Sequence, residues 1–469
     1  MPDSLPGSLG AAAAAWPRMA VVSHTHPSIS KGGAEIAAYA LFRGLRNLGV
    51  DALFVAGCAE ADRGRLHFGT PHERAVFHEP LRYDHLYHGG SPAVARDLAR
   101  LLTAERVGLA NFHHYLFLGL GAVQAAKSLA GATTVLTLHE YLAICQNHGQ
   151  MVTRPARALC EAASPEACGD CFPEFQRTQL MLRRANFLAA FDAVDHFVSP
   201  SEFLADRHAA WGLARERISV VENGLLGFRP DHRVPPAARR PDSPWAFGYF
   251  GQINQFKGVD VLLRACELIA DRKDLANRIQ IRVHGNLVGQ SAAFVETFEK
   301  AARDFPFFSY AGPYTNTAVR RLMADCDYVM VPSTWWENSP VVIQEAYAAG
   351  RPVLCSGIGG LAEKVPDGVA GLHFRPGDAP SLVEAMRRAM GEPLYEALLG
   401  GLPVPYDENE MARRYLDCFG AAAGGTATAC PEPPRHEREP LLAPRRRGKD
   451  LLKVKMGWGL GRDRAERAT

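Results

Sequence analysis

The chain has 469 residues, a hydrophobic content of 47% and a charged content of 22%, which are ordinary values for a globular protein and predict two or three domains. The formal net charge is only +2, which argues against a nucleic-acid partner. No apolar run has the roughly 18 residues that a membrane span needs, and no Lys or Arg precedes the short run Ala11–Ala15 as a signal peptide requires. We therefore expect a cytoplasmic protein.

The first part of the chain, residues 18–226, has the pattern of a doubly wound α/β domain. Residues 1–17 are rich in Ala, Pro, Gly and Ser and predict a disordered leader. A strand over Arg18–Ser23, a helix over Ala34–Leu48 and a strand over Asp51–Ala56 form the expected opening βαβ unit. Gly32 and Gly33 lie at its first turn. Most such pairs are simple turns, but at this position their free amides can bind an anion.

Two further strands are followed by histidines. The apolar runs Arg106–His113 and Val135–Leu138 predict these strands, and His139 directly follows the second. A single histidine at a strand end is by default structural. The carboxyl end of a parallel strand, however, faces the ligand crevice of such a domain, which favours a functional role for His139.

Residues 145–173 form a cysteine-rich insertion with little apolar periodicity. Four cysteines lie within it: Cys145, Cys160, Cys168 and Cys171. The Cys168-x2-Cys171 spacing is typical of zinc ligands, and a metal would order a segment that cannot build its own core. A structural zinc site is the sharper hypothesis; unlinked thiols, or disulfides in an oxidising compartment, are the alternatives.

The remaining elements complete the first domain and begin a second. Helices are expected over Arg177–Ala190 and Glu202–Trp211, strands over Val194–Ser199 and Ile218–Val221, and a Pro- and Arg-rich linker over residues 227–244. The second domain, residues 245–400, opens with strand Ala246–Phe250, loop Gly251–Gly258 and helix Val259–Ala270, followed by strands Ile279–His284 and Phe308–Tyr310. A lysine after a strand is by default a surface residue, but the flanking glycines favour a phosphate contact for Lys257.

A strand–helix–strand unit follows over residues 328–356. Tyr328–Val331 and Arg351–Ser356 are the strands, and Val341–Ala349 is the helix. Ser339 is the predicted helix N-cap and Pro340 the first-turn residue. The loop between Pro332 and Asn338 then lies at the carboxyl end of a parallel strand, where helix amides can bind an anion.

Two acids mark this unit. Glu345 lies on a helix that is nearly apolar all round, which predicts a buried carboxylate, and Glu337 lies eight residues earlier at the helix mouth. Both acids can face one crevice. Alternatively, Glu337 is a solvated loop charge and Glu345 pairs with an arginine of a neighbouring domain.

The register of these residues resembles the C-terminal signature of the retaining GT-B glycosyltransferases, family 4. The matching positions are Glu337, Glu345, Ala346, Gly350, Pro352, Val353, Gly359, Gly360 and Glu363. The resemblance implies that Glu337 contacts the hydroxyls of the donor sugar and that Glu345 holds the nucleotide ribose. It also implies a sugar contact by the backbone after Glu337, over Asn338, Ser339, Pro340 and Val341.

The resemblance extends to both domains, from Arg18 to Phe419. His139 followed by an acid resembles the family's residue close to the transferred sugar, and Gly32-Gly33 its N-terminal loop near the acceptor and the donor phosphates. In the loop from Gly251, the family uses an Arg and a Lys on the donor pyrophosphate. Lys257 matches the Lys, whereas Gln252 stands where Arg is usual.

The end of the chain is expected to leave the second domain. A helix is predicted over Ser381–Met390, and residues 401–420, with a helix over Glu408–Phe419, are expected to cross back to the first domain as in that family. In the tail, residues 421–469, the segment from Pro431 onward has eleven Lys and Arg against six Asp and Glu. This composition predicts disorder, with contact to anionic lipid head groups at the inner face of the membrane as the minority alternative.

The expected architecture is thus GT-B, with two Rossmann-like domains facing each other across a cleft. The expected activity is metal-independent transfer of a hexose, with retention, from a UDP- or GDP-sugar to a hydroxyl of a glycan or lipid-linked acceptor in polysaccharide or glycolipid synthesis. His139, Glu337 and Lys257 are the predicted catalytic residues, with no cofactor for catalysis. A nucleotide-sugar epimerase of the same fold is one alternative; a catalytically silent binding protein, suggested by Gln252, is the other.

Overall fold

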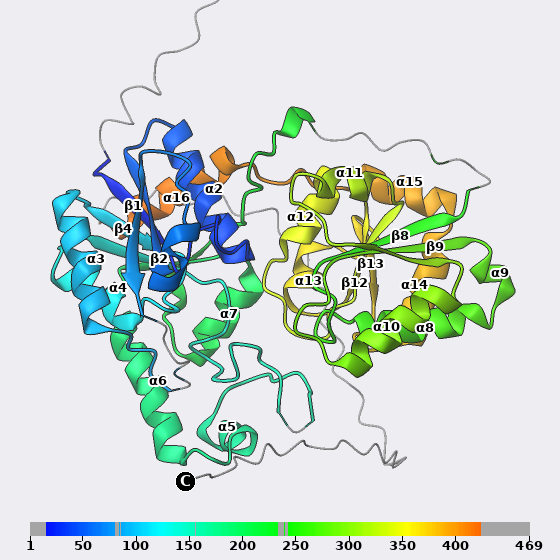
Figure 1. The fold of residues 1–469 in the computed structure, drawn as a ribbon, viewed down its shortest axis with the longest axis horizontal. Coiled ribbons are helices and arrows are strands. Elements are labelled where there is room, and N and C mark those ends of the chain that lie inside the picture. The colour runs from blue at the N-terminus through cyan, green and yellow to red at the C-terminus, as the bar shows by residue number, and fades with distance from the viewer. Residues whose placement is uncertain are drawn as a thin grey trace, which may run out of the picture. The chain divides into compact units, whose positions relative to one another are not determined.

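The computed structural model describes residues 16–79, 84, 86–154, 156–232, 239 and 243–423, and it contains two parallel sheets (Figure 1). Almost all of the predicted leader and of the predicted basic tail, and part of the predicted linker, lie outside these residues. Within the described ranges, no helix is both long and apolar enough to cross a membrane.

The first sheet has seven strands in the order β3-β2-β1-β4-β5-β6-β7, all parallel. Its strands are β1 (Met19–Ser23), β2 (Ala52–Ala59), β3 (Glu73–His78), β4 (Leu109–Phe112), β5 (Thr133–Thr137), β6 (His196–Ser199) and β7 (Ile218–Val220). The strand order reverses between β1 and β4, and such a switch point is where doubly wound sheets bind ligands.

Helices and turns connect these strands. They are α2 (Gly33–Asn47), η1 (Glu60–Arg65), α3 (Pro92–Ala104), α4 (Leu120–Ser128), α5 (Pro165–Cys171), α6 (Arg177–Phe191), α7 (Glu202–Trp211), η2 (Arg215–Arg217) and η3 (Pro230–His232). The central strands are buried along their whole length, because helices cover both faces of a parallel sheet.

The second sheet has six parallel strands in the order β10-β9-β8-β11-β12-β13, the same winding as the first. Its strands are β8 (Trp245–Phe250), β9 (Ile279–His284), β10 (Phe308–Gly312), β11 (Tyr328–Val331), β12 (Val353–Ser356) and β13 (Gly371–Phe374). Its helices are α8 (Val259–Ala270), α9 (Lys273–Ala276), α10 (Ala292–Asp304), α11 (Val319–Ala324), α12 (Val341–Ala348), α13 (Gly359–Lys364), α14 (Ala379–Ala389) and α15 (Glu392–Gly400). The prediction of two Rossmann-like domains is confirmed.

The last helix, α16 (Glu408–Ala422), packs on the first sheet although it follows the second in sequence. It is drawn in orange among the blue elements of the first sheet in Figure 1. Met411, Tyr415 and Phe419 are fully buried in the same core as Val21 of β1. The Tyr415 hydroxyl lies 3.2 Å from Thr137 Oγ1 at the end of β5. The helix therefore joins the second half of the chain to the first sheet near the end of β5.

The sequence pattern missed one edge strand in each sheet, β3 and β13. Only half of the residues of β3 are buried, and β13 is four residues long with a half-buried His373. Edge strands have a partner on one side only, so they lack the continuous apolar run that identified the central strands.

Candidate active site

The loop Pro332–Asn338 joins β11 to α12 and holds Glu337 in a buried position. Glu337 Oε1 accepts three hydrogen bonds, from Lys257 Nζ at 2.6 Å, Ser333 Oγ at 2.7 Å and Trp335 Nε1 at 2.8 Å. Burial raises the pKa of Glu337, but the charge of Lys257 and these hydrogen bonds outweigh it, so the pKa lies below its usual value. The structure thus brings together two predicted catalytic residues, Lys257 and Glu337, which form an ion pair between two loops.

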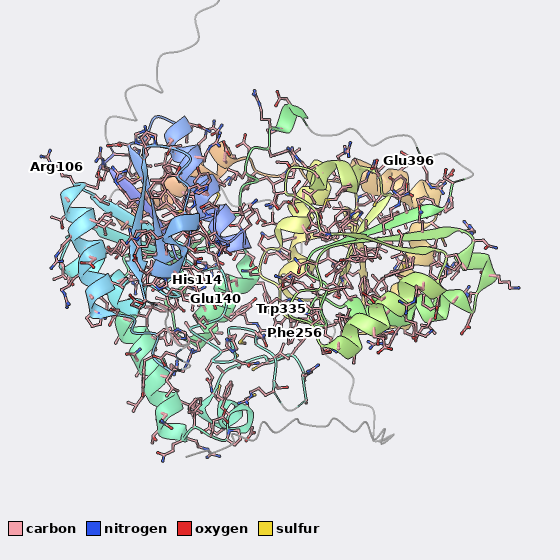
Figure 2. All side chains as sticks on the ribbon, viewed as in Figure 1. Arg106, His114, Glu140, Phe256, Trp335 and Glu396 are labelled. Atoms are coloured by element: carbon pink, nitrogen blue, oxygen red, sulfur yellow. The ribbon has the colours of Figure 1, made fainter. Side chains whose placement is uncertain are left out.

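The loop Gly251–Gly258, which carries Lys257, packs directly against the loop of Glu337. The Thr334 amide donates to Phe256 O at 2.9 Å, and the Phe256 and Trp335 rings lie side by side with centroids 5.7 Å apart (Figure 2). Gly258 has φ 73°, and a Cβ there would lie 1.8 Å from Pro332 O. Only glycine fits this close approach, so the two loops form one unit.

Gln252 lies at the exposed start of the same loop. Its carbonyl oxygen accepts a hydrogen bond from the Tyr249 hydroxyl at 2.5 Å. Its side-chain amide makes no hydrogen bond to any residue that the structure describes. Gln252 therefore leaves this end of the loop without a positive charge.

The start of α12 differs from the prediction. Pro340, and not Ser339, is the N-cap residue, and Val341 is the first helical residue. The Ser339 hydroxyl instead donates to the Glu222 carboxylate, and the Ser339 amide donates to Asn338 Oδ1 at 2.6 Å. The prediction that Ser339 is the N-cap is wrong, because its hydroxyl donates a hydrogen bond to Glu222 and not to the helix. No described residue accepts a hydrogen bond from the Val341 amide, so this amide is open to a ligand.

Glu345 lies one turn along α12 and is half-buried rather than fully buried. Burial raises the pKa of its carboxyl group to about 7, and the positive charge of Arg320 opposes that rise only in part. Among the described residues, no side chain donates a hydrogen bond to it or pairs with it. Its carboxylate is therefore unengaged, whereas Oε1 of Glu337 accepts three hydrogen bonds.

On the first sheet, His139 directly follows β5 and belongs to a cluster of histidines. Its Nε2 lies 2.9 Å from His113 Nδ1, and its carbonyl oxygen accepts a hydrogen bond from Asn338 Nδ2. Burial, with a smaller contribution from His24, lowers the pKa of His139 to about 3. The imidazole is therefore neutral at physiological pH, and the Asn338 contact joins it to the loop of Glu337.

The sequence reasoning missed the other members of this cluster. His24 follows β1, His113 and His114 follow β4, and Glu140 follows His139, so three neighbouring strands contribute. The His24 and His114 ring centroids are 4.8 Å apart, and His114 Nε2 lies 3.7 Å from Glu140 Oε1 (Figure 2). Burial raises the pKa of Glu140 to about 8. A polar residue after each of three adjacent strands was the signal that could have found them.

Gly32 and Gly33 lie at the start of α2, as predicted, but an acid occupies part of that space. A Cβ on Gly32 would lie 2.5 Å from Glu35 Oε2, whereas a Cβ on Gly33 would meet nothing within 4 Å. Glu35 Oε1 also lies 3.6 Å from His24 Nε2. The carboxylate of Glu35 thus already places negative charge at this helix N-terminus, while the side of Gly33 is open.

The four cysteines of the insertion are half-buried free thiols. Among the described residues, no group of three or more His, Cys, Asp or Glu side chains is arranged to hold a metal ion, and the zinc site stays a prediction. Burial, with the charges of Cys145 and Cys160, raises the pKa of Cys168 to about 11. Cys145, Cys160 and Cys168 thus lie close enough to influence one another's ionisation.

A hollow of about 600 Å3 lies elsewhere, lined by residues of α2, of the segment after Gly227 and of the start of α16. It contains none of the predicted site residues.

Models of two known families match the chain. The model described as Glycosyltransferase Family 4 matches residues 31–225, and that described as Glycosyl transferases group 1 matches residues 245–392. Together they span nearly all of both sheets.

Curated relatives carry the name D-inositol 3-phosphate glycosyltransferase. The protein of Nocardioides sp. is 27% identical over 349 residues, which cover 70% of this chain and 71% of that one. The protein of Streptomyces avermitilis is 28% identical over 281 residues, and the chain spans just over half of its length, 56%. That of Corynebacterium aurimucosum is 24% identical over 87% of this chain and 94% of its own.

Solved structures share the fold at low sequence identity. Anabaena Alr3699/HepE in complex with UDP-glucose has a TM-score of 0.60 and 18% identity, and covers 87% of this chain and 100% of its own. Sucrose-phosphate synthase from Thermosynechococcus elongatus has a TM-score of 0.61 and 16% identity over 87% of this chain and 99% of its own. With both family models matched and this fold shared, the chain belongs to the group 1 glycosyl transferases, family 4, and is a glycosyltransferase of the GT-B fold.

Proposed function

We propose that the protein transfers a hexose from a UDP- or GDP-sugar to an acceptor hydroxyl, with retention of the anomeric configuration and without a metal ion. The observation that carries this proposal is the ion pair between the half-buried Lys257 and the buried Glu337, in which Glu337 lies shortly before the open first-turn amide of Val341. A cation and a helix N-terminus side by side suit a diphosphate, and a buried acid suits sugar hydroxyls.

The donor occupies the second domain in this proposal. When the bond from the anomeric carbon to the diphosphate breaks, its electron pair goes to the leaving phosphate oxygen. Lys257 and the amides at the start of α12 stabilise that charge. The half-buried, unengaged Glu345 accepts hydrogen bonds from the ribose. The UDP-glucose bound to the Anabaena protein supports this class of donor.

The acceptor lies against the histidine cluster. His139 is neutral and joined to Asn338, so its position is coupled to the loop that holds the sugar. The acceptor oxygen bonds to the anomeric carbon as its proton passes to the leaving phosphate. A glycan or a lipid-linked acceptor is the first candidate. A phosphorylated cyclitol is the second, because the relatives from Nocardioides and Streptomyces are named for one.

A donor and acceptor panel tests the proposal. Purified protein is incubated with UDP-glucose, UDP-N-acetylglucosamine, UDP-galactose and GDP-mannose, with and without inositol phosphate or lipid-linked acceptors, in buffer containing EDTA. We expect one donor to give a new glycoside whose anomeric proton has the configuration of the donor.

Each alternative gives a different result. A changed nucleotide sugar formed without acceptor would identify an epimerase. No nucleotide release from any donor would favour a binding protein, and loss of turnover in EDTA would contradict metal independence.

A further inference from the structure

The cysteine-rich insertion carries a short hairpin near its start. Val152 and Leu159 form an antiparallel bridge, the Thr153 amide donates to Ala158 O at 2.9 Å, and the Cys160 amide donates to Met151 O at 2.8 Å. Its tip carries two arginines, Arg154 and Arg157, only three residues apart. The hairpin thus carries two exposed arginines near its tip.

The two arginines have different surroundings. Arg154 pairs with Glu174 at 2.7 Å and stacks over the Phe172 ring at 4.3 Å, so it is engaged within the insertion. Arg157 is exposed and donates from Nη1 to Gln255 Oε1, in the Gly251–Gly258 loop. No carboxylate of the described part of the chain lies within ion-pair distance of Arg157. Its charge is therefore available to a ligand at that loop.

The backbone of Arg157 is held in an uncommon conformation. Its φ is 51°, in the left-handed region, and its amide donates to Thr153 O at 2.9 Å. Non-glycine residues seldom adopt this region without a structural or functional reason. The turn thus sets the direction of the Cα–Cβ bond of Arg157, and the contact with Gln255 Oε1 shows where its guanidinium reaches.

The loop that Arg157 reaches carries a single positive charge, and that charge is already paired. Lys257 is its only basic side chain, and it is neutralised by Glu337 at 2.6 Å. A leaving nucleoside diphosphate carries at least two negative charges. Gln252 is neutral and supplies no positive charge to balance them. A planar guanidinium binds phosphate oxygens in a bidentate manner and keeps its charge at every physiological pH.

We propose that Arg157 is a donor-binding residue, supplied by the cysteine-rich insertion, that contacts the terminal phosphate of the donor diphosphate. This inference rests on the proposed function and deepens it. In the bound state the guanidinium exchanges Gln255 Oε1 for phosphate oxygens. When the glycosidic bond breaks, Arg157 and Lys257 together stabilise the charge on the leaving oxygen.

Calorimetric titration of the full chain with UDP, GDP and the matching monophosphates tests the assignment. For the diphosphate that the wild type binds, we expect Arg157→Ala to weaken binding about 10-fold or more, because a hydrogen bond to a charged group is lost. The monophosphate affinity should change less than about twofold. Arg154→Ala, on the same hairpin, is the matched control and should leave both affinities unchanged.

Two further variants separate the charge from a merely structural contact with Gln255. Arg157→Lys keeps the charge but not the bidentate geometry, and should recover part of the diphosphate affinity that Arg157→Ala loses. Arg157→Gln keeps a polar contact to Gln255 without charge, and should bind as weakly as Arg157→Ala. Gln252→Arg added to Arg157→Ala should restore affinity by returning a cation to the other end of the loop.

Two results would overturn the assignment while leaving the proposed function intact. The first is that Arg157→Gln recovers diphosphate affinity and Arg157→Lys does not. The second is that Arg157→Ala binds the diphosphate as tightly as the wild type. If the wild type binds neither diphosphate, the proposed function fails and this assignment with it. Melting temperatures of all variants identify misfolding; should Arg157→Ala unfold, the comparison of the Lys and Gln variants decides alone.

Discussion

Lys257 and Glu337 form an ion pair of 2.6 Å although 80 residues separate them in the chain. The pair joins the loops that follow β8 and β11, two neighbouring strands of the second sheet. In the proposed function this cation contacts the donor diphosphate and this acid the sugar, and the two are held by each other before any ligand binds. The first prediction concerns what happens when this pair is broken.

Lys257→Ala should lower kcat/KM about 100- to 1,000-fold, because a preorganised charge next to the leaving group is lost. The variant should also melt at a lower temperature, since Glu337 stays buried without its counter-ion. Steady-state kinetics and thermal denaturation measure the two effects, with Lys273→Ala, an exposed lysine of α9, as control. Near wild-type turnover by Lys257→Ala would show that this loop does not contact the diphosphate.

The raised pKa of Glu345 predicts a pH-dependent stability. A carboxyl group with a pKa of about 7 in the folded protein and about 4.5 in the unfolded chain binds protons more tightly when folded. Its contribution to the free energy of unfolding therefore decreases as the pH rises from 4.5 to 7. Glu345→Gln should melt above the wild type at pH 8 and show little difference at pH 4.

Glu267→Gln, at an exposed position of α8, is the control for this effect and should not move the melting temperature at either pH. Glu345→Gln should also weaken donor binding at pH 8, because the ionised carboxylate is the stronger acceptor for ribose hydroxyls. A variant that gains no stability at pH 8, or that binds the donor like the wild type, would contradict this account of Glu345.

Gly258→Ala should separate the two loops of the proposed donor site. Gly258 has φ 73° and a Cβ there would lie 1.8 Å from Pro332 O, whereas Gly289 has φ 77° and open space around it. Gly289→Ala therefore measures the backbone cost alone, about 1 kcal/mol. Gly258→Ala should cost about 3 kcal/mol or more in the free energy of unfolding, and should weaken nucleotide binding. Equal costs in denaturant titrations would mean that the close approach of the loops is not required.

The zinc prediction from the cysteine spacing is tested by metal analysis. If Cys145, Cys160, Cys168 and Cys171 close on one ion, purified protein at pH 8 should contain about one equivalent of zinc, with the four thiols protected from alkylation. Binding would convert the thiols to thiolates against the burial that raises the pKa of Cys168. Less than about half an equivalent, with four freely reacting thiols, would leave the insertion ordered by protein contacts alone.

The sequence by itself determined the fold class and identified the local part of the proposed donor site. The apolar runs of β1, β8 and β11, and the glycines in the loops after β1 and β8, are features of neighbouring residues, and local chemistry decides where such strands and turns begin. Lys257 and Glu337 were likewise predicted as site residues from local sequence. Each was identified from the loop in which it lies.

Tertiary structure alone decided which of these groups meet. Ser339 was a sound local N-cap, but its hydroxyl pairs with Glu222, which is 117 residues away. His24 and His114 touch because β1 and β4 are neighbours in the sheet, and Arg157 meets Gln255 because a hairpin of the insertion reaches the donor loop. Such contacts depend on strand order and on packing over long chain separations, and neither periodicity nor spacing along the sequence encodes them.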